Sequence, residues 1–489
     1  MDQLVLLGPE IILTVAALVV LTVDLVSDRV GRTWAPWLTL LAIVLAIADA
    51  QWFFYARQPV FGNTYTVDEF LSFFRIVSLV IAALIVFASK EYVERRTRFV
   101  AEFYALLLFV TLSIILLAGS IDLIMIFLSF EFLSITSYIM VGYLRDDVRS
   151  SEGSIKYFLY GSVSSAIMLY GMSLLYGASG GETNLARIAA AFANAPAGSA
   201  NLIVVAIILT IVGFGFKIAL APFHQWSPEA YEGAPTPVTA FISVGPKVAG
   251  FAVLARVMIT ALPHFAADWT NLLWAIAAIS MTLGNLVALR QTNIKRLLAY
   301  SSIAQTGYML IGIVANVATG EGLRGILVYL IAYVFTNLGL FIAVIAYSDA
   351  IGSDEITDYA GMIQRAPGLA LAMVIFFLSL AGIPPTAGFI GKFLVFGAAL
   401  DAAKAGGPSQ LLIWLAIIGA VNSVVSVGYY FNIVRYMFFM PPKDPTPVRV
   451  TPTLNWSLGF ATLMTLVMGI VPQPFITFAE QSVRAIFKG

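Results

Sequence analysis

The sequence contains no cysteine and only two histidines, His224 and His264, which limits the chemistry that it can carry. Without cysteine, the chain forms no disulfide, ligates no iron–sulfur cluster and cannot attach haem through a C-x-x-C-H motif. The two histidines stand in different connections between apolar segments, so they are poorly placed to hold one haem. We therefore expect no redox cofactor and no metal site in this chain.

Charged residues are also scarce. They make up 11% of the 489 residues, whereas 60% are hydrophobic. An ordinary soluble domain carries about 25% charged residues, so a soluble fold could not cover its surface with so few. Lipid must therefore cover much of the chain. The formal net charge is zero, which gives no reason to expect a nucleic acid as a partner.

Apolar runs long enough to cross a bilayer as helices recur along the chain. An open sheet is excluded in lipid, because its edge groups would stay unpaired. The N-terminus lacks the positive stretch that opens a secretory signal peptide, so we expect the first apolar run to remain as a helix. The sequence thus predicts an all-α integral membrane protein of about fourteen transmembrane helices, with a short interfacial helix near Thr183–Asn194. The predicted spans are 8–26, 34–54, 70–89, 101–119, 121–143, 155–177, 201–222, 235–261, 270–290, 295–316, 323–347, 366–398, 410–436 and 454–475.

Lysine and arginine are distributed unevenly among the connections, which indicates orientation. The odd-numbered connections carry sixteen such residues, including Arg95, Arg96, Lys295 and Arg296. The even-numbered connections carry four, namely Arg57, Arg187, Arg324 and Lys404. The odd connections are therefore predicted to face the cytoplasm. With an even number of helices, both termini are predicted on the outer side.

Two of the predicted spans contain proline where a continuous helix is unfavourable. Pro222 stands in FGFKIALAPFHQW, and Pro384 and Pro385 stand in LSLAGIPPTAGFIGKF. Proline removes a backbone donor and clashes with the preceding turn. Non-helical backbone at membrane depth persists only where protein buries it or a wet cavity accepts it. One interrupted helix in each half indicates duplicated halves and an ion or substrate site near the breaks, although two ordinary proline kinks would give the same pattern.

Four ionisable residues lie within the predicted spans rather than at their ends: Glu131, Lys217, Lys247 and Lys392. Each costs about 2.5–3.5 kcal/mol on insertion scales, so these groups must pair, lose their charge or touch water. Burial favours the neutral amine and a nearby carboxylate favours the charged one, so a lysine under both influences can exchange a proton near neutral pH. The residues therefore predict a proton relay. Static ion pairs that hold helices together are the alternative.

Other polar residues near these charges could relay protons or hold water. His224 lies at the first break, and the unperturbed pKa of histidine is about 6.5, although a structural hydrogen bond would explain it equally well. Packing by small and polar residues is the ordinary alternative for the rest. The candidates in the ninth to eleventh spans are Ser301, Gln305, Tyr308, Tyr333 and Asn337.

The sequence resembles the antiporter-like subunits of respiratory complex I, the proton-translocating NADH:quinone oxidoreductase. The clearest match is QTNIKRLLAYSSIAQTGYMLIG, residues 291–312. FLSFEFLSITSYIMVGY surrounds Glu131, FKIALAPFHQWSPEAYEGAPTPVTAF includes Lys217, and LAGIPPTAGFIGKF ends at Lys392. The length, the lysine at 392 and the YEGAPTPVTAF stretch are most similar to the N-type subunit.

This resemblance implies two inverted five-helix repeats, residues 101–261 and 270–437, each with one broken helix. A three-helix segment, 1–100, would precede them, and 438–489 would carry the fourteenth helix. Glu131 and Lys217 would form a paired switch, Lys247 a central relay and Lys392 the outward group. NADH, FMN, iron–sulfur clusters and quinone would reside in other membrane and peripheral subunits, and the complex would lie in the bacterial cytoplasmic membrane.

The function that follows is a translocase subunit that moves protons while quinone is reduced elsewhere in the complex. Two alternatives remain open at this point. Subunits of multi-subunit sodium/proton antiporters share the fold that the resemblance implies, although no set of oxygen ligands in this sequence is dedicated to sodium. The second alternative is a structural scaffold, whose buried charges only hold helices together.

Overall fold

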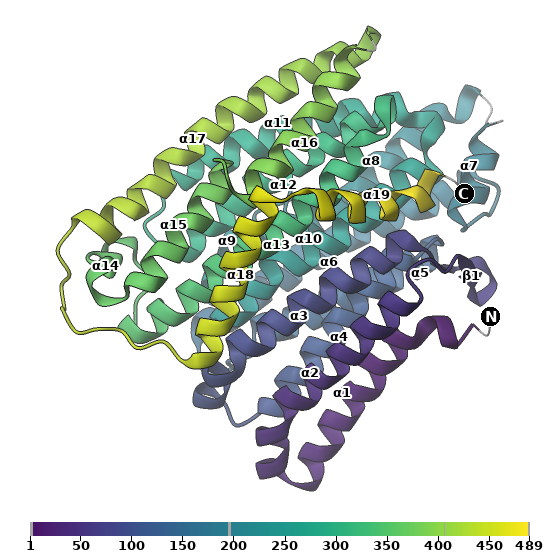
Figure 1. Cartoon of the computed structure of the whole chain (residues 1–489). Coiled ribbons are helices and arrows are strands. Elements are labelled where there is room, and N and C mark those ends of the chain that lie inside the picture. Colours follow the sequence, from purple (N-terminus) through teal and green to yellow (C-terminus); the bar gives the residue numbers. More distant parts are fainter. Residues whose placement is uncertain (1–2, 194–196, 405, 488–489) are drawn as a thin grey trace. The chain divides into compact units, whose positions relative to one another are not determined.

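The computed structural model describes residues 3–193, 197–404 and 406–487, and nearly all of this chain is helical (Figure 1). Among the described residues, thirteen helices are long and apolar enough to cross a membrane. The remaining predicted span, 366–398, is interrupted and forms two shorter helices. The prediction of an all-α integral membrane protein is therefore confirmed, and every predicted span corresponds to a helix or an interrupted helix.

The chain divides into two compact units, which are described separately. The first comprises Met1–Ile218, Gly245–Leu272 and Glu480–Gly489. Its elements are α1 (Gly8–Val26), α2 (Asp28–Trp52), β1 (Gln58–Val60), β2 (Tyr65–Val67), α3 (Glu69–Arg96), α4 (Val100–Gly119), α5 (Leu123–Val141), α6 (Val148–Ala178), α7 (Leu185–Ala193), α8 (Ala200–Lys217) and most of α10 (Thr236–Arg256).

The second unit comprises Ala219–Val244 and Leu273–Ala479. Its elements are α9 (Trp226–Gly233), most of α11 (Ala266–Ala288), α12 (Ile294–Thr319), α13 (Glu321–Ile351), α14 (Met362–Arg365), α15 (Pro367–Ala381), α16 (Ala387–Lys404), α17 (Leu412–Phe439) and α18 (Pro452–Ile470). The last helix, α19 (Gln473–Phe487), begins in this unit and ends in the first.

Both units also contain short helical turns. These are η1 (Val5–Leu7), η2 (Phe61–Asn63), η3 (Ala197–Ser199), η4 (Val257–Ala261), η5 (Pro263–Phe265), η6 (Ile356–Tyr359) and η7 (Gly407–Leu411).

Two elements were not predicted from the sequence. A short antiparallel hairpin pairs β1 with β2 in the connection after α2. Helix α19 follows the last span. It is amphipathic, so polar residues interrupt its sequence and it contains no continuous apolar run. The short helix expected near Thr183–Asn194 is present as α7.

The two units begin corresponding helices in the same way. Asp122 caps the start of α5 by accepting a hydrogen bond from the backbone N–H of Ile124 (2.9 Å). Asn293 caps the start of α12 by accepting one from the backbone N–H of Lys295 (2.9 Å). Each capping residue also forms an isolated β-bridge, Asp122 with Asn184 and Asn293 with Glu355. In both units, the bridging partner stands immediately before a short helix, α7 or η6.

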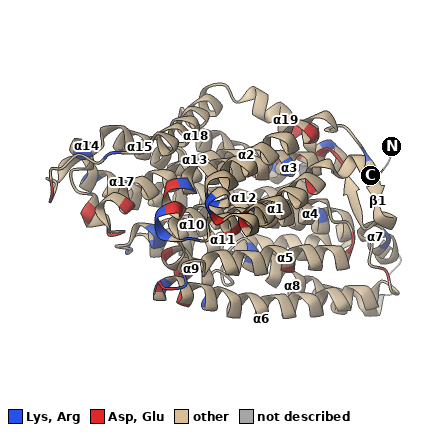
Figure 2. Cartoon of the chain, turned by 90° about the horizontal axis from the view of Figure 1, so that it is seen from below, with Lys and Arg blue, Asp and Glu red and all other residues tan. Residues whose placement is uncertain are grey.

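Burial differs strongly among the spans. The most apolar part of α13 is completely buried, whereas only 33% of the corresponding part of α17 is. Exposed leucine, isoleucine and tryptophan side chains cover α17 and α18, as a lipid-facing surface requires. Most of the ribbon in Figure 2 carries no charge, and the charged residues occupy short stretches of it. The ionisable residues that lie within spans are therefore exceptional.

Candidate functional site

The first interruption separates α8 from α9. Helix α8 ends at Lys217, and Ala219 then adopts a left-handed backbone conformation with φ of 56°. The Ala221–Pro222 peptide bond is cis, and Pro222 has no N–H to continue a helix. The next helix, α9, starts only at Trp226. The predicted break at Pro222 is therefore present, and it leaves carbonyl groups at the end of α8 without helical partners.

Lys217 is fully buried, with 0% of its surface exposed. Its ammonium group donates a hydrogen bond to Oγ of Ser134 on α5 (2.6 Å). It also lies 4.7 Å from the centre of the Phe130 ring, within the range of a cation–π interaction. Both contacts are made by neutral groups.

Glu131 lies on α5 beside these two contacts. The described part of the chain has no ion pair within 4.0 Å between Glu131 and Lys217. The Oε1 atom of Glu131 is buried and has no hydrogen-bond partner in this part of the protein. Ser134, one turn further along α5, contacts the Lys217 ammonium directly instead. The expected Glu131–Lys217 pair is therefore not in direct contact in this structure.

Lys247 lies in α10 and is 2% exposed. It donates a hydrogen bond to the carbonyl oxygen of Ile218 (2.9 Å), the residue that caps the C-terminal end of α8. The C-terminal end of a helix carries partial negative charge, which favours a cation. The first break therefore provides an acceptor for this lysine.

The second interruption separates α15 from α16, and the Pro384–Pro385 bond within it is cis. Lys392 on α16 is 4% exposed and donates hydrogen bonds to the carbonyls of Leu380 (2.9 Å) and Ala381 (3.2 Å) at the end of α15. Gly382 leaves room for the side chain of Lys392. Its φ is 84°, and a Cβ atom there would lie 2.8 Å from Cδ of Lys392. A lysine thus binds helix-end carbonyls at both breaks.

Polar side chains surround Lys392 within the second unit. The ammonium donates a hydrogen bond to Oγ of Ser423 (3.0 Å) and lies 4.3 Å from the centre of the Tyr308 ring. Gln305 donates to the same Leu380 carbonyl (2.9 Å), and its Oε1 accepts from Tyr329. The sequence-predicted residues Gln305 and Tyr308 are therefore in the immediate surroundings of the lysine.

The other predicted polar residues form buried hydrogen bonds further from Lys392. Ser301 bonds with Tyr430. Tyr333 bonds with Ser302 (2.7 Å), and Asn337 donates to Oγ of Ser243 (2.7 Å). His224 lies on the turn between α8 and α9, where it is partly exposed and has its ring 6.5 Å from that of Tyr300.

Several residues of these surroundings were not singled out from the sequence. They are hydroxyl and amide residues within apolar helices: Ser134, Ser243, Asn285, Asn422, Ser423 and Tyr430. Ser134 could have been found, because it follows Glu131 by three residues and so shares its helix face. The others are far from Lys392 in sequence, so only the tertiary structure brings them together. In the described part of the chain, no group of three or more histidine, aspartate or glutamate residues could hold a metal ion.

Comparison with known proteins identifies the family of the chain. The family described as NADH:quinone oxidoreductase/Mrp antiporter, TM matches residues 120–425, which contain all four ionisable candidates. NADH-quinone oxidoreductase subunit N of Trichlorobacter lovleyi is 42% identical over 480 residues, which cover 98% of this chain and 96% of that protein. The similarity therefore extends over the full set of spans.

Solved structures give the same result. A chain of respiratory complex I from Thermus thermophilus with bound aureothin aligns with a TM-score of 0.80 and 33% identity, covering 96% of this chain and 98% of that one. A chain of the Mrp complex from Dietzia sp. DQ12-45-1b aligns with a TM-score of 0.85 but only 20% identity, covering 99% and 98%, so this likeness shows the fold alone. The chain belongs to the NADH:quinone oxidoreductase/Mrp antiporter transmembrane family, and within that family it is an antiporter-like subunit of the N type.

Proposed function

We propose that this chain is the N-type membrane subunit of an NADH:quinone oxidoreductase and that Glu131, Lys217, Lys247 and Lys392 carry its protons. The names of the relatives support the assignment to this enzyme, because 42% identity extends over nearly the whole length. NADH, FMN, iron–sulfur clusters and quinone then belong to other subunits. This chain supplies the translocation step, and quinone reduction elsewhere supplies the energy.

One observation supports the proton-carrying role above the others. Lys217 and Lys392 are buried in membrane-spanning helices, yet neither has a carboxylate within 4.0 Å in the described part of the chain. Their partners are hydroxyl oxygens, carbonyl oxygens and aromatic rings. A neutral amine can keep these contacts by accepting a hydrogen bond from a hydroxyl or by resting against a ring. Loss of the proton therefore breaks no direct ion pair at these two positions.

Glu131 gates the first lysine. When its carboxylate approaches Lys217, the ammonium form is stabilised, and when it moves away the proton is released. With an effective dielectric constant near 20, widening a charge pair from 4 to 8 Å changes its Coulomb energy by about 2 kcal/mol. Moving one charge against 100 mV costs about 2.3 kcal/mol. A modest movement of one side chain is therefore enough for a single transfer.

Lys247 receives the proton next, and the carbonyl of Ile218 holds its ammonium form. Ser243 lies four residues earlier on α10 and hence on the same helix face. Ser243 in turn accepts hydrogen bonds from Asn337 (2.7 Å) and Tyr333 (3.4 Å). Water held among such hydroxyl and amide groups would continue the path, with Lys392 as the outward group.

The finer localisation follows from the distribution of positive charge. We assign the odd-numbered connections to the cytoplasm, and both termini to the outer side of a bacterial cytoplasmic membrane. The partners are the other membrane and peripheral subunits of the complex, together with lipid.

The proposal is tested with the assembled complex in sealed vesicles. Lys247→Met is expected to lower the ratio of protons translocated to electrons transferred. Lys404→Met, in an exposed lysine that pairs with Asp401, is the matched control and should leave the ratio unchanged. A native ratio in Lys247→Met at normal turnover would contradict the role of that lysine. A requirement for sodium, seen when choline replaces it, would favour the antiporter alternative.

A further inference from the structure

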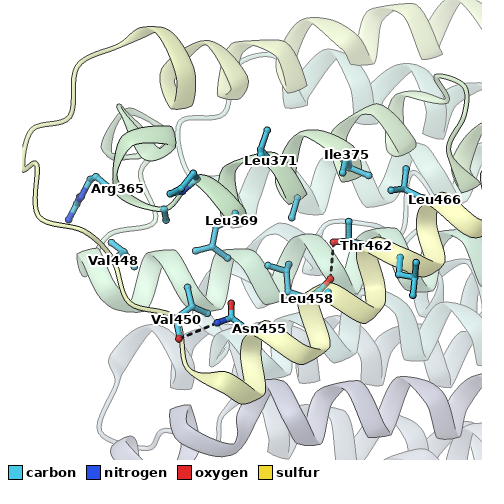
Figure 3. Close-up of a pocket in the computed structure, with 16 residues that line it drawn as sticks. Arg365, Leu369, Leu371, Ile375, Val448, Val450, Asn455, Leu458, Thr462 and Leu466 are labelled. Atoms are coloured by element: carbon cyan, nitrogen blue, oxygen red, sulfur yellow. Dashed lines mark hydrogen bonds between the residues drawn. The ribbon is translucent and has the colours of Figure 1, made fainter.

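Two polar side chains of α18 illustrate local hydrogen bonding in a membrane-spanning helix. Beside the apolar groove between α15 and α18, Thr462 donates a hydrogen bond to the carbonyl of Leu458 (2.8 Å) (Figure 3). Asn455 donates one to the carbonyl of Val450, just before the helix (3.4 Å). Bonds of this kind satisfy a polar group within its own segment and join no helices. Asn285 of α11 is different, because most of its hydrogen bonds cross to other helices.

Asn285 is fully buried, with 0% of its surface exposed. Its Nδ2 atom donates to the carbonyl of Met281 on the same helix (2.9 Å) and to the hydroxyl of Tyr308 on α12 (2.9 Å). It also donates to Oδ1 of Asn422 on α17 (3.3 Å). The Oδ1 atom of Asn285 accepts a hydrogen bond from the Tyr429 hydroxyl on α17 (2.9 Å). One amide therefore joins three helices of the second unit.

Two glycines allow α11 and α12 to approach each other at this point. Gly284 precedes Asn285, and a Cβ atom there would lie 2.8 Å from a backbone nitrogen of α12. Gly307 precedes Tyr308, and a Cβ atom there would lie 2.9 Å from a backbone nitrogen of α11. Both distances are shorter than van der Waals contact, so a side chain at either position would push the two helices apart. The hydrogen bond between Asn285 and Tyr308 depends on this close approach.

The partners of Asn285 lead to the ammonium group of Lys392. The Tyr308 ring, whose hydroxyl bonds with Asn285, has its centre 4.3 Å from the ammonium. Asn422 immediately precedes Ser423, whose Oγ accepts a hydrogen bond from the ammonium (3.0 Å). Both contacts that Lys392 makes in addition to the helix-end carbonyls are therefore attached to one amide side chain.

We propose that Asn285 is a positioning residue for Lys392. Its hydrogen bond to Tyr308 holds the ring against the ammonium, and its bonds to α17 hold the segment that carries Ser423. A ring kept at contact distance stabilises a cation, whereas a ring that turns away does not. Asn285 therefore affects how Lys392 holds and releases its proton, an inference that rests on the proposed role of this lysine as a proton carrier.

The site requires an amide rather than another side chain of similar size. Tyr308 accepts a hydrogen bond from position 285, whereas Tyr429 donates one to it. An amide can answer both, because it donates through its nitrogen and accepts through its oxygen. If the amide served packing alone, its removal would lower stability and leave proton translocation by the assembled complex unchanged. Translocation and stability are therefore measured side by side.

Three variants in the assembled complex separate positioning from packing. Asn285→Leu removes all the hydrogen bonds of the amide at similar volume. Tyr308→Phe removes only the hydroxyl and keeps the ring beside Lys392. Asn316→Leu is the matched control, because Asn316 is also buried on α12, at 4% exposure, but accepts its hydrogen bond from the backbone N–H of Leu323 on α13.

Proton translocation per electron is measured in sealed vesicles over a range of pH, and Tm is measured on the same preparations. We expect Asn285→Leu to lower translocation about twofold to fivefold, the loss expected when a cation–π contact is misplaced, and to displace its pH profile. Tyr308→Phe should act in the same direction. The double variant should lose little more than Asn285→Leu alone, because both changes break one hydrogen bond. Asn316→Leu should lower Tm but keep native translocation and the native pH profile.

Lys392→Met distinguishes failure of this inference from failure of the proposed function. Native translocation and a native pH profile in Asn285→Leu, together with a loss in Lys392→Met, would overturn the positioning role alone. Native translocation in Lys392→Met would overturn the proposed function itself. Losses that simply add in the double variant would also overturn the positioning role. If Asn285→Leu does not assemble, Tyr308→Phe decides the question, and native translocation by that variant would overturn the inference.

Discussion

Arginines and lysines are buried to similar depths in this protein, but their surroundings differ. Arg75 is 0% exposed and donates hydrogen bonds to Glu10 on α1 (2.7 Å). Arg256 is 4% exposed and donates to Asp68 (2.7 Å), the residue that caps α3. Lys217 and Lys392, in contrast, contact neutral oxygens and rings.

This difference separates two uses of buried charge. An arginine beside a carboxylate is a fixed cation, because guanidinium is always protonated in proteins. Removing the arginine would leave the carboxylate buried without a counter-charge. A lysine whose direct contacts are all neutral breaks no direct ion pair when it loses its proton. Arg75 and Arg256 are of the first kind, since each forms an ion pair with a buried carboxylate.

The largest expected effect comes from breaking a fixed pair. Glu10→Ala leaves Arg75 buried without its carboxylate, which should cost about 3–5 kcal/mol of stability. Thermal denaturation and the yield of assembled complex would measure it. Arg57→Ala removes an exposed partner of Glu69 and should cost no more than about 1 kcal/mol. Equal Tm values for the two variants would contradict the distinction between buried and exposed pairs.

A second prediction exchanges one kind of cation for the other. Lys392→Arg keeps a positive charge at the end of α15 but cannot release a proton. We expect proton translocation to fall at least tenfold, as in Lys392→Met, which corresponds to about 1.4 kcal/mol or more. Translocation is measured in vesicles by a pH-sensitive dye. Rescue by arginine would instead support the hypothesis that the charge is only structural.

A third prediction concerns the backbone that admits Lys392. Gly382→Ala places a side chain at φ of 84°, which should destabilise the protein by about 1 kcal/mol and displace the lysine. Gly397→Ala is the matched control, because this glycine lies within α16 with open space around it. Its replacement should raise Tm slightly. A higher Tm in both variants would show that the break tolerates a side chain.

The smallest effect is expected outside the membrane. Hydrogen bonds from Lys443 and then from Ser353 hold the pKa of Asp358 below its usual value. The resulting stabilisation is fully present above the unfolded pKa, roughly 3.9, and disappears as pH falls through the lower folded value. Lys443→Ala should therefore lower Tm at pH 7, by an amount equivalent to no more than about 1 kcal/mol, and leave it unchanged near pH 2. A constant difference across this range would contradict the assignment.

The sequence predicted the spans and the breaks because both depend on local chemistry. Continuous apolar runs require lipid, and Pro222, Pro384 and Pro385 cannot continue a helix. Helix α19 was missed because its two faces differ in polarity, so no apolar run marks it. A search for helical periodicity in the last residues would have found it.

The contacts of the lysines could not be predicted in the same way. Proximity in the family pattern suggested that Glu131 pairs with Lys217, but Ser134 makes the direct contact. The carbonyls of Leu380 and Ala381 become available to Lys392 only because the break frees them and folding brings α16 back beside them. Such contacts depend on tertiary geometry, which residue types alone do not specify.

The most direct test uses Lys217→Met, because the direct contacts of this ammonium are with a hydroxyl group and an aromatic ring. Ser134 keeps its hydrogen bond to the Phe130 carbonyl (2.8 Å), so stability should be preserved. The decisive measurement is the proton-to-electron ratio of this variant complex in sealed vesicles. The Tm of the variant is measured beside it and compared with that of the native complex. The account predicts a lower ratio with unchanged Tm. A native ratio, or a complex that fails to assemble as Glu10→Ala does, would contradict it.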